Sequence, residues 1–132
     1  MRLAQHIETH IQTGDAADTV TLDYEARFLR RKRLVSDAGE PFLVELAETQ
    51  SLSQGEGFRL DDGRIIAVMA AAEPLLAVRH GNLARIAWHV GNRHTPCQIA
   101  DDHILIREDK VLQAMLEGLG ASVTQVLSLI HI

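Results

Sequence analysis

The residues best suited to chemistry in this chain lie in the short segment 88–96, which reads Trp-His-Val-Gly-Asn-Arg-His-Thr-Pro. His94 completes a stripe of residues at helical spacing, and Pro96 stops a helix because proline offers no N–H. The stripe consists of Leu83, Ile86, Ala87, Val90 and His94. We therefore expect His94 to lie in line with the core-facing stripe and yet to be accessible at the end of a helix.

An accessible imidazole at this position could bind a metal ion. Gly91 precedes His94 by about one helical turn and would let a second backbone approach closely. If two copies pack across a two-fold axis near these helix ends, two His94 imidazoles face each other. Neutral imidazole binds zinc, copper and nickel, and affinity rises toward nickel and copper among divalent ions. Spacing alone still favours the simpler alternative, a histidine that merely ends a helix.

Two further residues could add ligands to such a site. Cys97 follows closely, but Pro96 breaks the helix between it and His94, so Cys97 is more simply a small buried hydrophobe. His131 stands near the end of the chain, apart from the other candidates. Both residues are auxiliary ligand candidates beside His94.

A second cluster, formed by Asp101, Asp102 and His103, could serve as metal ligands or as a small hydrolytic site. Adjacent aspartates are also common in turns, and a turn is the favoured interpretation. The sequence contains no phosphate-binding loop, dinucleotide-binding glycine pattern, serine-nucleophile pattern or zinc-protease motif. No nucleophile is paired with a base, so an enzyme is not expected.

The composition narrows the class of protein. With 132 residues, of which 46% are hydrophobic and 23% charged, the chain can build a packed core. Its single cysteine excludes an internal disulfide and the zinc modules that need more than one cysteine. The net charge of −5 argues against a nucleic-acid-binding protein. Because the longest apolar run, residues 65–72, is too short to span a membrane and no signal peptide is visible, we expect a soluble cytoplasmic protein.

The first half of the chain is expected to form strands. Candidates are residues 20–24, 28–35, 42–46, 58–60 and 64–68. Asp61-Asp62-Gly63 is a hairpin signal, because glycine accepts the positive φ of a tight turn. No helical period precedes residue 80, so residues 1–72 are predicted to form a small all-β domain.

One strand candidate of this half carries a run of basic residues, Arg30-Arg31-Lys32-Arg33. Alternation along a strand would place Arg31 and Arg33 on one face and Arg30 and Lys32 on the other. Since the chain as a whole is acidic, we interpret this basic run as a partner surface or a solvated edge strand rather than a phosphate site.

The second half follows the order β-α-β-β-α-β. Strands are predicted at residues 75–78, 97–100, 103–107 and 122–127, and helices at residues 81–93 and 108–119. The apolar stripe of the second helix consists of Leu112, Met115, Leu116 and Leu119, with Gly120 as its C-terminal cap. This is the ferredoxin-like plan, so residues 73–132 are expected to form a ferredoxin-like domain in an α+β protein.

Residues 88–99, together with residues 104–106 and 115–120, resemble the UreE family of urease accessory proteins. The most specific part is Gly-Asn-Arg-His at residues 91–94 with the following Pro96, and the resemblance covers nearly the whole chain. It implies a nickel metallochaperone that is a homodimer through its second domain and binds Ni²⁺ through His94 of both protomers. In vitro, Zn²⁺ or Cu²⁺ could occupy the same site.

The resemblance also implies partners. The first domain would resemble a peptide-binding module of heat-shock co-chaperones and contact urease components, and the dimer would pass nickel to the urease apoprotein complex with an accessory GTPase. Two departures stand out. Arg107, Glu108 and Lys110 occupy a region where some members carry extra histidines, and residues 128–132 end the chain where many members continue into a histidine-rich tail. His131 is a candidate substitute for part of that tail.

Two other functions compete with this one. An RNA-binding module could share the ferredoxin-like sheet, but residues 75–78 and 104–106 carry no aromatic side chain on which bases could stack. A small metal-dependent hydrolase could use the Asp101, Asp102 and His103 cluster, but it needs an open metal site beside a general base.

Overall fold

A computed structural model describes residues 1–12 and 14–131 of the chain. The chain divides into two compact units, Met1–Ala71 and Ala72–Ile132, which are described separately below. Each unit buries its own cluster of apolar side chains. No helix in the described part of the chain is long and apolar enough to cross a membrane.

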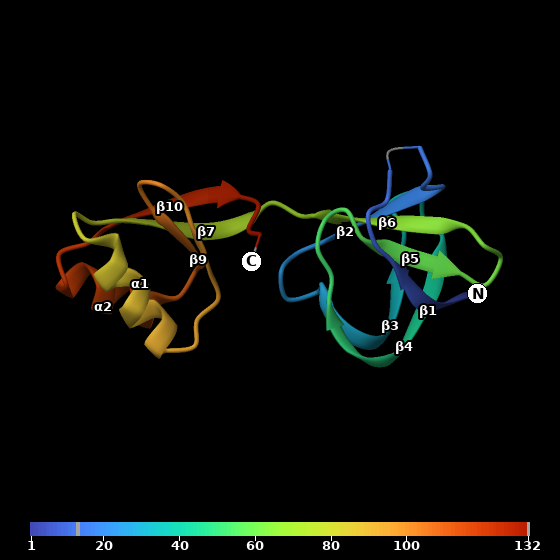
Figure 1. Cartoon of the computed structure of the whole chain (residues 1–132), viewed down its shortest axis with the longest axis horizontal. Helices are drawn as coiled ribbons and strands as arrows, with labels where there is room; N and C mark the ends of the chain where they lie inside the picture. Colours follow the sequence, from blue (N-terminus) through green and yellow to red (C-terminus); the bar gives the residue numbers. More distant parts are fainter. Residues whose placement is uncertain (13, 132) are drawn as a thin grey trace. The chain divides into compact units, whose positions relative to one another are not determined.

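The first unit is a curled sheet of six strands (Figure 1). They are β1 (Arg2–Glu8), β2 (Asp18–Leu22), β3 (Phe28–Val35), β4 (Pro41–Ser51), β5 (Gly57–Leu60) and β6 (Ile65–Ala70), in the spatial order β2-β6-β5-β1-β4-β3. The pairs β1–β4 and β2–β6 are parallel and the others are antiparallel. The all-β architecture predicted for this half is confirmed.

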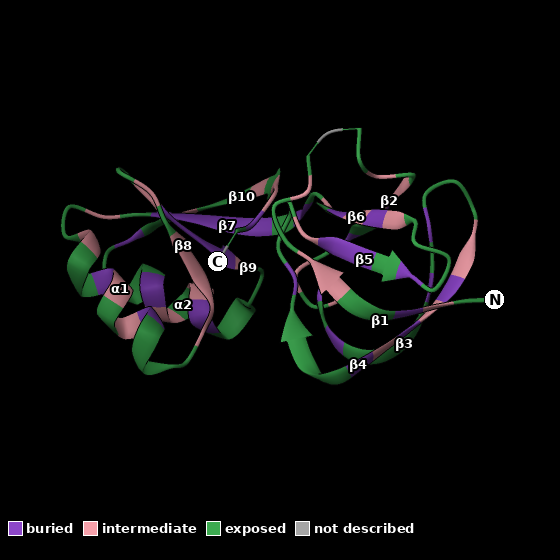
Figure 2. Cartoon of the chain, turned by 45° about the vertical axis from the view of Figure 1, so that its right-hand side comes forward, coloured by how far each residue is buried: buried purple, intermediate pink, exposed green. Residues whose placement is uncertain are grey.

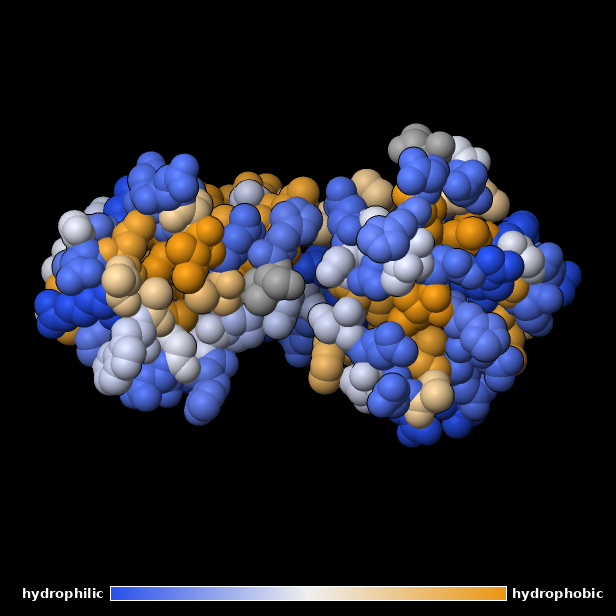
Figure 3. Space-filling model, viewed as in Figure 1, coloured by the Kyte–Doolittle hydropathy of each residue, from blue (hydrophilic) through white to orange (hydrophobic). Residues whose placement is uncertain are grey.

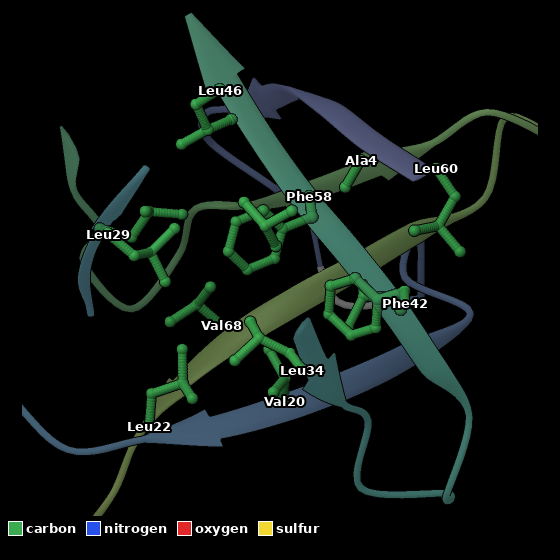
Figure 4. Close-up of a cluster of buried hydrophobic side chains, with 13 residues drawn as sticks. Ala4, Val20, Leu22, Leu29, Leu34, Phe42, Leu46, Phe58, Leu60 and Val68 are labelled. Atoms are coloured by element: carbon green, nitrogen blue, oxygen red, sulfur yellow. The ribbon is translucent and has the colours of Figure 1, made fainter. Parts of the chain in front are cut away.

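Curling lets one face of the sheet enclose its own core. Phe42 and Phe58 are both fully buried there, with ring centroids 5.7 Å apart (Figure 4). The predicted hairpin joins β5 to β6, with Gly63 at φ 89°. Strand β1 was not predicted from the sequence, because its polar residues outnumber its apolar ones and only Ala4 is fully buried.

The second unit has the order β7 (Glu73–Arg79), α1 (Leu83–Asn92), β8 (Cys97–Ile99), β9 (Ile104–Arg107), α2 (Lys110–Gly118) and β10 (Ser122–Ser128). Its strands form an antiparallel sheet in the order β10-β7-β9-β8, which confirms the ferredoxin-like plan. Both helices pack their buried residues on one face of this sheet (Figure 1). That core contains Leu76, Val78, Ile86, Val90, Ile104, Ile106, Leu112 and Leu116.

The helix-free face of this sheet is also covered. Strand β7 is buried along most of its length, and Leu75 and Ala77, which alternate with the helix-facing residues, are both buried (Figure 2). Residue 131 lies beside β8, because the backbone N–H of His131 donates to Oε1 of Gln98 at 2.9 Å. Ile130, next to His131, is completely buried.

Candidate metal site at the end of helix α1

Helix α1 is fixed at its start by a side-chain cap and along its length by two core residues. The Asn82 side chain accepts a hydrogen bond from the backbone N–H of Arg85 at 3.1 Å. Ile86 and Val90 are completely buried and hold the helix on the sheet. These contacts fix the position of the segment that follows.

The helix ends in a Schellman motif, the double hydrogen bond that closes many helix C-termini. The N–H of His94 donates to the carbonyl of Gly91 at 2.9 Å, and the N–H of Thr95 donates to the carbonyl of Val90 at 3.3 Å. His94 itself has φ 55°, in the left-handed region. The backbone, rather than Pro96, therefore ends the helix at Asn92, before the proline is reached.

This geometry corrects the expectation that His94 continues the core-facing stripe. The helix stops two residues earlier, and the left-handed residue reverses the chain direction, so His94 leaves the stripe and is exposed. Accessibility was predicted correctly, but its cause is the left-handed backbone. For a residue with a Cβ, this conformation costs roughly 1–2 kcal/mol, although histidine adopts it more often than most residues do.

Helix α2 ends in the same motif with a different residue. The N–H of Gly120 donates to the carbonyl of Glu117 at 3.0 Å, and the N–H of Ala121 donates to that of Leu116 at 3.1 Å. Gly120 has φ 87° and no Cβ to strain. His94 and Gly120 thus occupy equivalent positions, and α2 carries the residue that helix ends normally prefer.

The surface around the end of α1 is open and partly apolar. Trp88 on this helix is 64% exposed, and its ring meets the ring of His89 edge-on at 5.0 Å. Gly91 has open space where a Cβ would lie, so nothing in its own unit obstructs an approaching chain. Elsewhere on this unit, Figure 3 shows apolar side chains among hydrophilic ones. A second protein surface could therefore pack here.

The two auxiliary candidates lie in different settings. Cys97 opens β8 opposite Ile106 and is half-buried against the core, and this burial raises the pKa of its thiol. Because the thiolate is the metal-binding form, a raised pKa weakens Cys97 as a ligand. His131 is exposed and held through its backbone by Gln98. Within residues 1–12 and 14–131, no group of three or more histidine, cysteine, aspartate or glutamate side chains could hold a metal ion.

The Asp101, Asp102 and His103 cluster forms the turn between β8 and β9, as favoured from the sequence. The N–H of Ala100 donates to the carbonyl of His103 at 2.9 Å, which closes the turn. Oδ1 of Asp102 lies 2.6 Å from Nδ1 of His103, and this hydrogen bond lowers the pKa of the Asp102 carboxyl. These residues therefore have a structural role in the hairpin.

His80, which the sequence analysis did not single out, has a clear structural role. Nδ1 of His80 accepts a hydrogen bond from the backbone N–H of Asn82 at 2.9 Å. Its Nε2 lies 3.2 Å from the carbonyl oxygen of Leu119, the last residue before Gly120. This pattern corresponds to a neutral ring protonated at Nε2, which joins the start of α1 to the end of α2.

Comparison with known proteins covers both units. Residues 2–71 match the family described as UreE urease accessory protein, N-terminal domain, and residues 73–130 match its C-terminal domain. The chain belongs to the UreE family of urease accessory proteins. UreE proteins are accessory chaperones of urease maturation and not catalytic enzymes, which removes the hydrolase alternative.

Individual UreE relatives are similar over most of this chain. The urease accessory protein UreE of Rhodobacter capsulatus is 62% identical over 108 residues, covering 82% of this chain and 69% of the relative. That of Paracoccus denitrificans is 61% identical over 105 residues, covering 80% of this chain and 67% of the relative. That of Cereibacter sphaeroides is 58% identical over 108 residues, covering 82% of this chain but only 59% of the relative.

Proposed function

We propose that this chain is a nickel-binding metallochaperone that delivers Ni²⁺ to apo-urease. The observation that carries the proposal is His94, an exposed imidazole held in a left-handed position at the end of a helix that is itself anchored in the core. Residues that the surrounding structure holds in strained conformations of this kind cluster at functional sites. Imidazole is also a good ligand for Ni²⁺.

A homodimer would complete the site. One imidazole supplies one ligand, so a metal ion at His94 needs further ligands from another molecule. A two-fold axis near the ends of two α1 helices would bring His94 of each protomer to the same ion. The exposed Trp88 ring and the open space at Gly91 support a packed surface there. A site with few ligands from each chain suits a cargo that must be released.

The imidazole ligand is compatible with Ni²⁺ but does not by itself select it over other divalent ions. Imidazole binds Ni²⁺, Cu²⁺ and Zn²⁺, and affinity for a given site rises from Ni²⁺ to Cu²⁺, so Cu²⁺ or Zn²⁺ would also occupy the site in vitro. His131 stays a proposed auxiliary ligand because it is exposed. Cys97 stays a weaker one because burial raises the pKa of its thiol.

The partners of this function belong to the same proposal. The accepting partner is the urease apoprotein complex, assisted by an accessory GTPase, in the cytoplasm. Residues 1–72 would contact urease components, and residues 73–132 would hold the metal and the dimer interface. The family described for both units, the urease accessory proteins, supports an assignment to urease assembly.

Calorimetric titration with Ni²⁺ tests the site. The native protein is expected to bind about one tightly held ion per dimer, as a shared two-fold site requires. The variant His94→Gly keeps the left-handed backbone and removes the imidazole, so tight binding should be lost. His6→Ala, at an exposed histidine of the first unit, is the matched control and should bind like the native protein. Unchanged tight binding in His94→Gly would exclude His94 as the metal anchor.

A further inference from the structure

The basic run at residues 30–33 lies on strand β3, at one edge of the six-stranded sheet. Strand β3 pairs with β4 on one side only, so its other side presents backbone groups that the sheet does not use. All four basic side chains are exposed. The sequence analysis left a partner surface and a solvated edge open as explanations, and the structure supplies observations that separate them.

The first observation is that the basic run has no acidic partners. Within residues 1–12 and 14–131, no ion pair involves any of the four residues, although the chain carries 18 acidic side chains. Other arginines of the same unit are paired: Arg59 with Glu8, and Arg64 with Glu40 and Asp62. Glu45 faces Arg31 across the β3–β4 pair without forming an ion pair. A concentrated positive charge is therefore available to another molecule.

The second observation is that apolar side chains flank the charge. Phe28 is 64% exposed and Val35 is 54% exposed, at the two ends of β3. Leu29 and Leu34 are both buried although they are five residues apart, because the β3–β4 register shifts between Leu29 and Arg31. Phe28 and Val35 each lie next to one of these buried residues, so both point away from the core. These side chains add apolar surface that a partner could cover beside the charges. The pattern fits an extended partner with acidic residues in its middle and apolar residues at its ends.

We propose that the free edge of β3 binds an extended acidic segment of a partner protein, which adds to the sheet as a further strand. Backbone hydrogen bonds would supply affinity, and carboxylates facing Arg31 and Arg33 would select the partner. Pairing with the same edge of a second copy is disfavoured, because it would oppose two runs of like charge. This inference does not depend on the metal site, since β3 belongs to the other unit.

The test measures binding of labelled peptides to the full chain by fluorescence anisotropy at low salt. The probe is a blocked peptide with the sequence Val-Thr-Glu-Thr-Glu-Thr-Val, in which the two glutamates stand at alternate positions, as Arg31 and Arg33 do, and a valine stands at each end. A peptide with Lys in place of Glu should not bind measurably. A copy with N-methylated backbone amides should also lose binding, because an added strand donates hydrogen bonds through those amides.

Variants locate the surface. Arg31→Glu with Arg33→Glu should weaken binding about tenfold or more, because two attractive contacts become repulsive. The matched pair Arg79→Glu with Arg85→Glu, exposed in the second unit, should leave binding unchanged. If the charge reversals unfold the protein, Arg31→Gln with Arg33→Gln is used instead, with a smaller expected loss.

Three results would overturn the proposal. Equal binding by the Lys peptide would show that charge does not select the partner, and equal binding by the N-methylated peptide would show that no strand is added. Tighter binding of a single-stranded oligouridylate than of the acidic peptide, lost with the same arginines, would assign the basic run to nucleic acid instead.

Discussion

The two helices of the second unit end in the same backbone motif but place different residues at its left-handed position. In α2 that residue is Gly120 at φ 87°, and in α1 it is His94 at φ 55°. The hydrogen bonds that close the two ends have the same pattern and similar lengths. The two helix ends therefore share their backbone hydrogen bonds and differ in the residue at the left-handed position.

Under the proposed function, this difference separates a structural helix end from one that would hold a metal ion. Glycine adopts the left-handed conformation without strain, and the end of α2 is further tied to His80 through the carbonyl of Leu119. His94 at the end of α1 destabilises the fold through its left-handed backbone, and its ring is exposed. The comparison teaches that the imidazole is placed where it is accessible and where glycine would be the more stable choice.

The largest effect on stability is expected when the left-handed glycine at the end of α2 is replaced by a residue with a Cβ, which would be strained as His94 is. Gly120→Ala should lower the free energy of unfolding by about 1–2 kcal/mol, because alanine resists positive φ. The added Cβ would lie 3.8 Å from Nε2 of His80, an ordinary contact, so backbone strain accounts for the loss. Urea unfolding measures it. Gly118→Ala, in open space within the helix, is the control and should stabilise by about 0.5 kcal/mol.

The His80 contact should account for the next effect. His80→Ala removes the hydrogen bond that Asn82 donates and the one that reaches Leu119, so we expect a loss of about 1–2 kcal/mol. The backbone N–H of Gly120 should then exchange faster with solvent than that of His94, which can be followed by hydrogen exchange. Equal exchange at both helix ends would contradict the structural role assigned to His80.

The starts of the two helices offer a smaller contrast. The Asp109 side chain accepts hydrogen bonds from two backbone N–H groups, those of Val111 and Leu112, both at 3.0 Å. Asn82 accepts only one, from Arg85. Asp109→Ala should therefore destabilise by about 1 kcal/mol, and Asn82→Ala by less. Thermal unfolding of both variants checks the order, and the reverse order would contradict it.

The smallest effect has the opposite sign. His94→Gly should raise the free energy of unfolding of the metal-free protein by up to about 1 kcal/mol, because it relieves the left-handed strain. His94→Asn should fall between the two, since asparagine tolerates this conformation. Urea unfolding in the presence of a chelator measures both variants. A loss of stability in His94→Gly would mean that the imidazole makes stabilising contacts of its own.

Much of the fold could be predicted because the patterns that specify it are local. Ile86 and Val90 in α1, and Leu112 and Leu116 in α2, follow helical spacing and are buried as expected. The Asp61-Asp62-Gly63 turn predicted the β5–β6 hairpin, which the structure confirms. The parallel pairing of β1 with β4 was not predicted, because it joins segments distant in sequence and no short turn signals it.

His94 was predicted to be an accessible residue at a helix end, and it is, but its predicted place on the helical stripe was wrong. Spacing placed His94 on the helical stripe, and the Schellman hydrogen bonds remove it from that stripe. The spacing of apolar residues indicates which side chains share a helix face. It does not show where the helix ends, because that depends on which groups hydrogen-bond to the last backbone carbonyls. One signal was present, since a proline two residues after His94 is common just beyond a helix C-terminus.

One paired measurement on His94→Gly tests the central claim most directly, namely that His94 exchanges stability for metal binding. Nickel affinity and the unfolding midpoint of the metal-free protein are determined on the same preparations of the native chain and the variant. We predict that the variant loses tight Ni²⁺ binding while its unfolding midpoint stays equal or rises. Retained tight binding, or a clear fall in the midpoint, would contradict the claim.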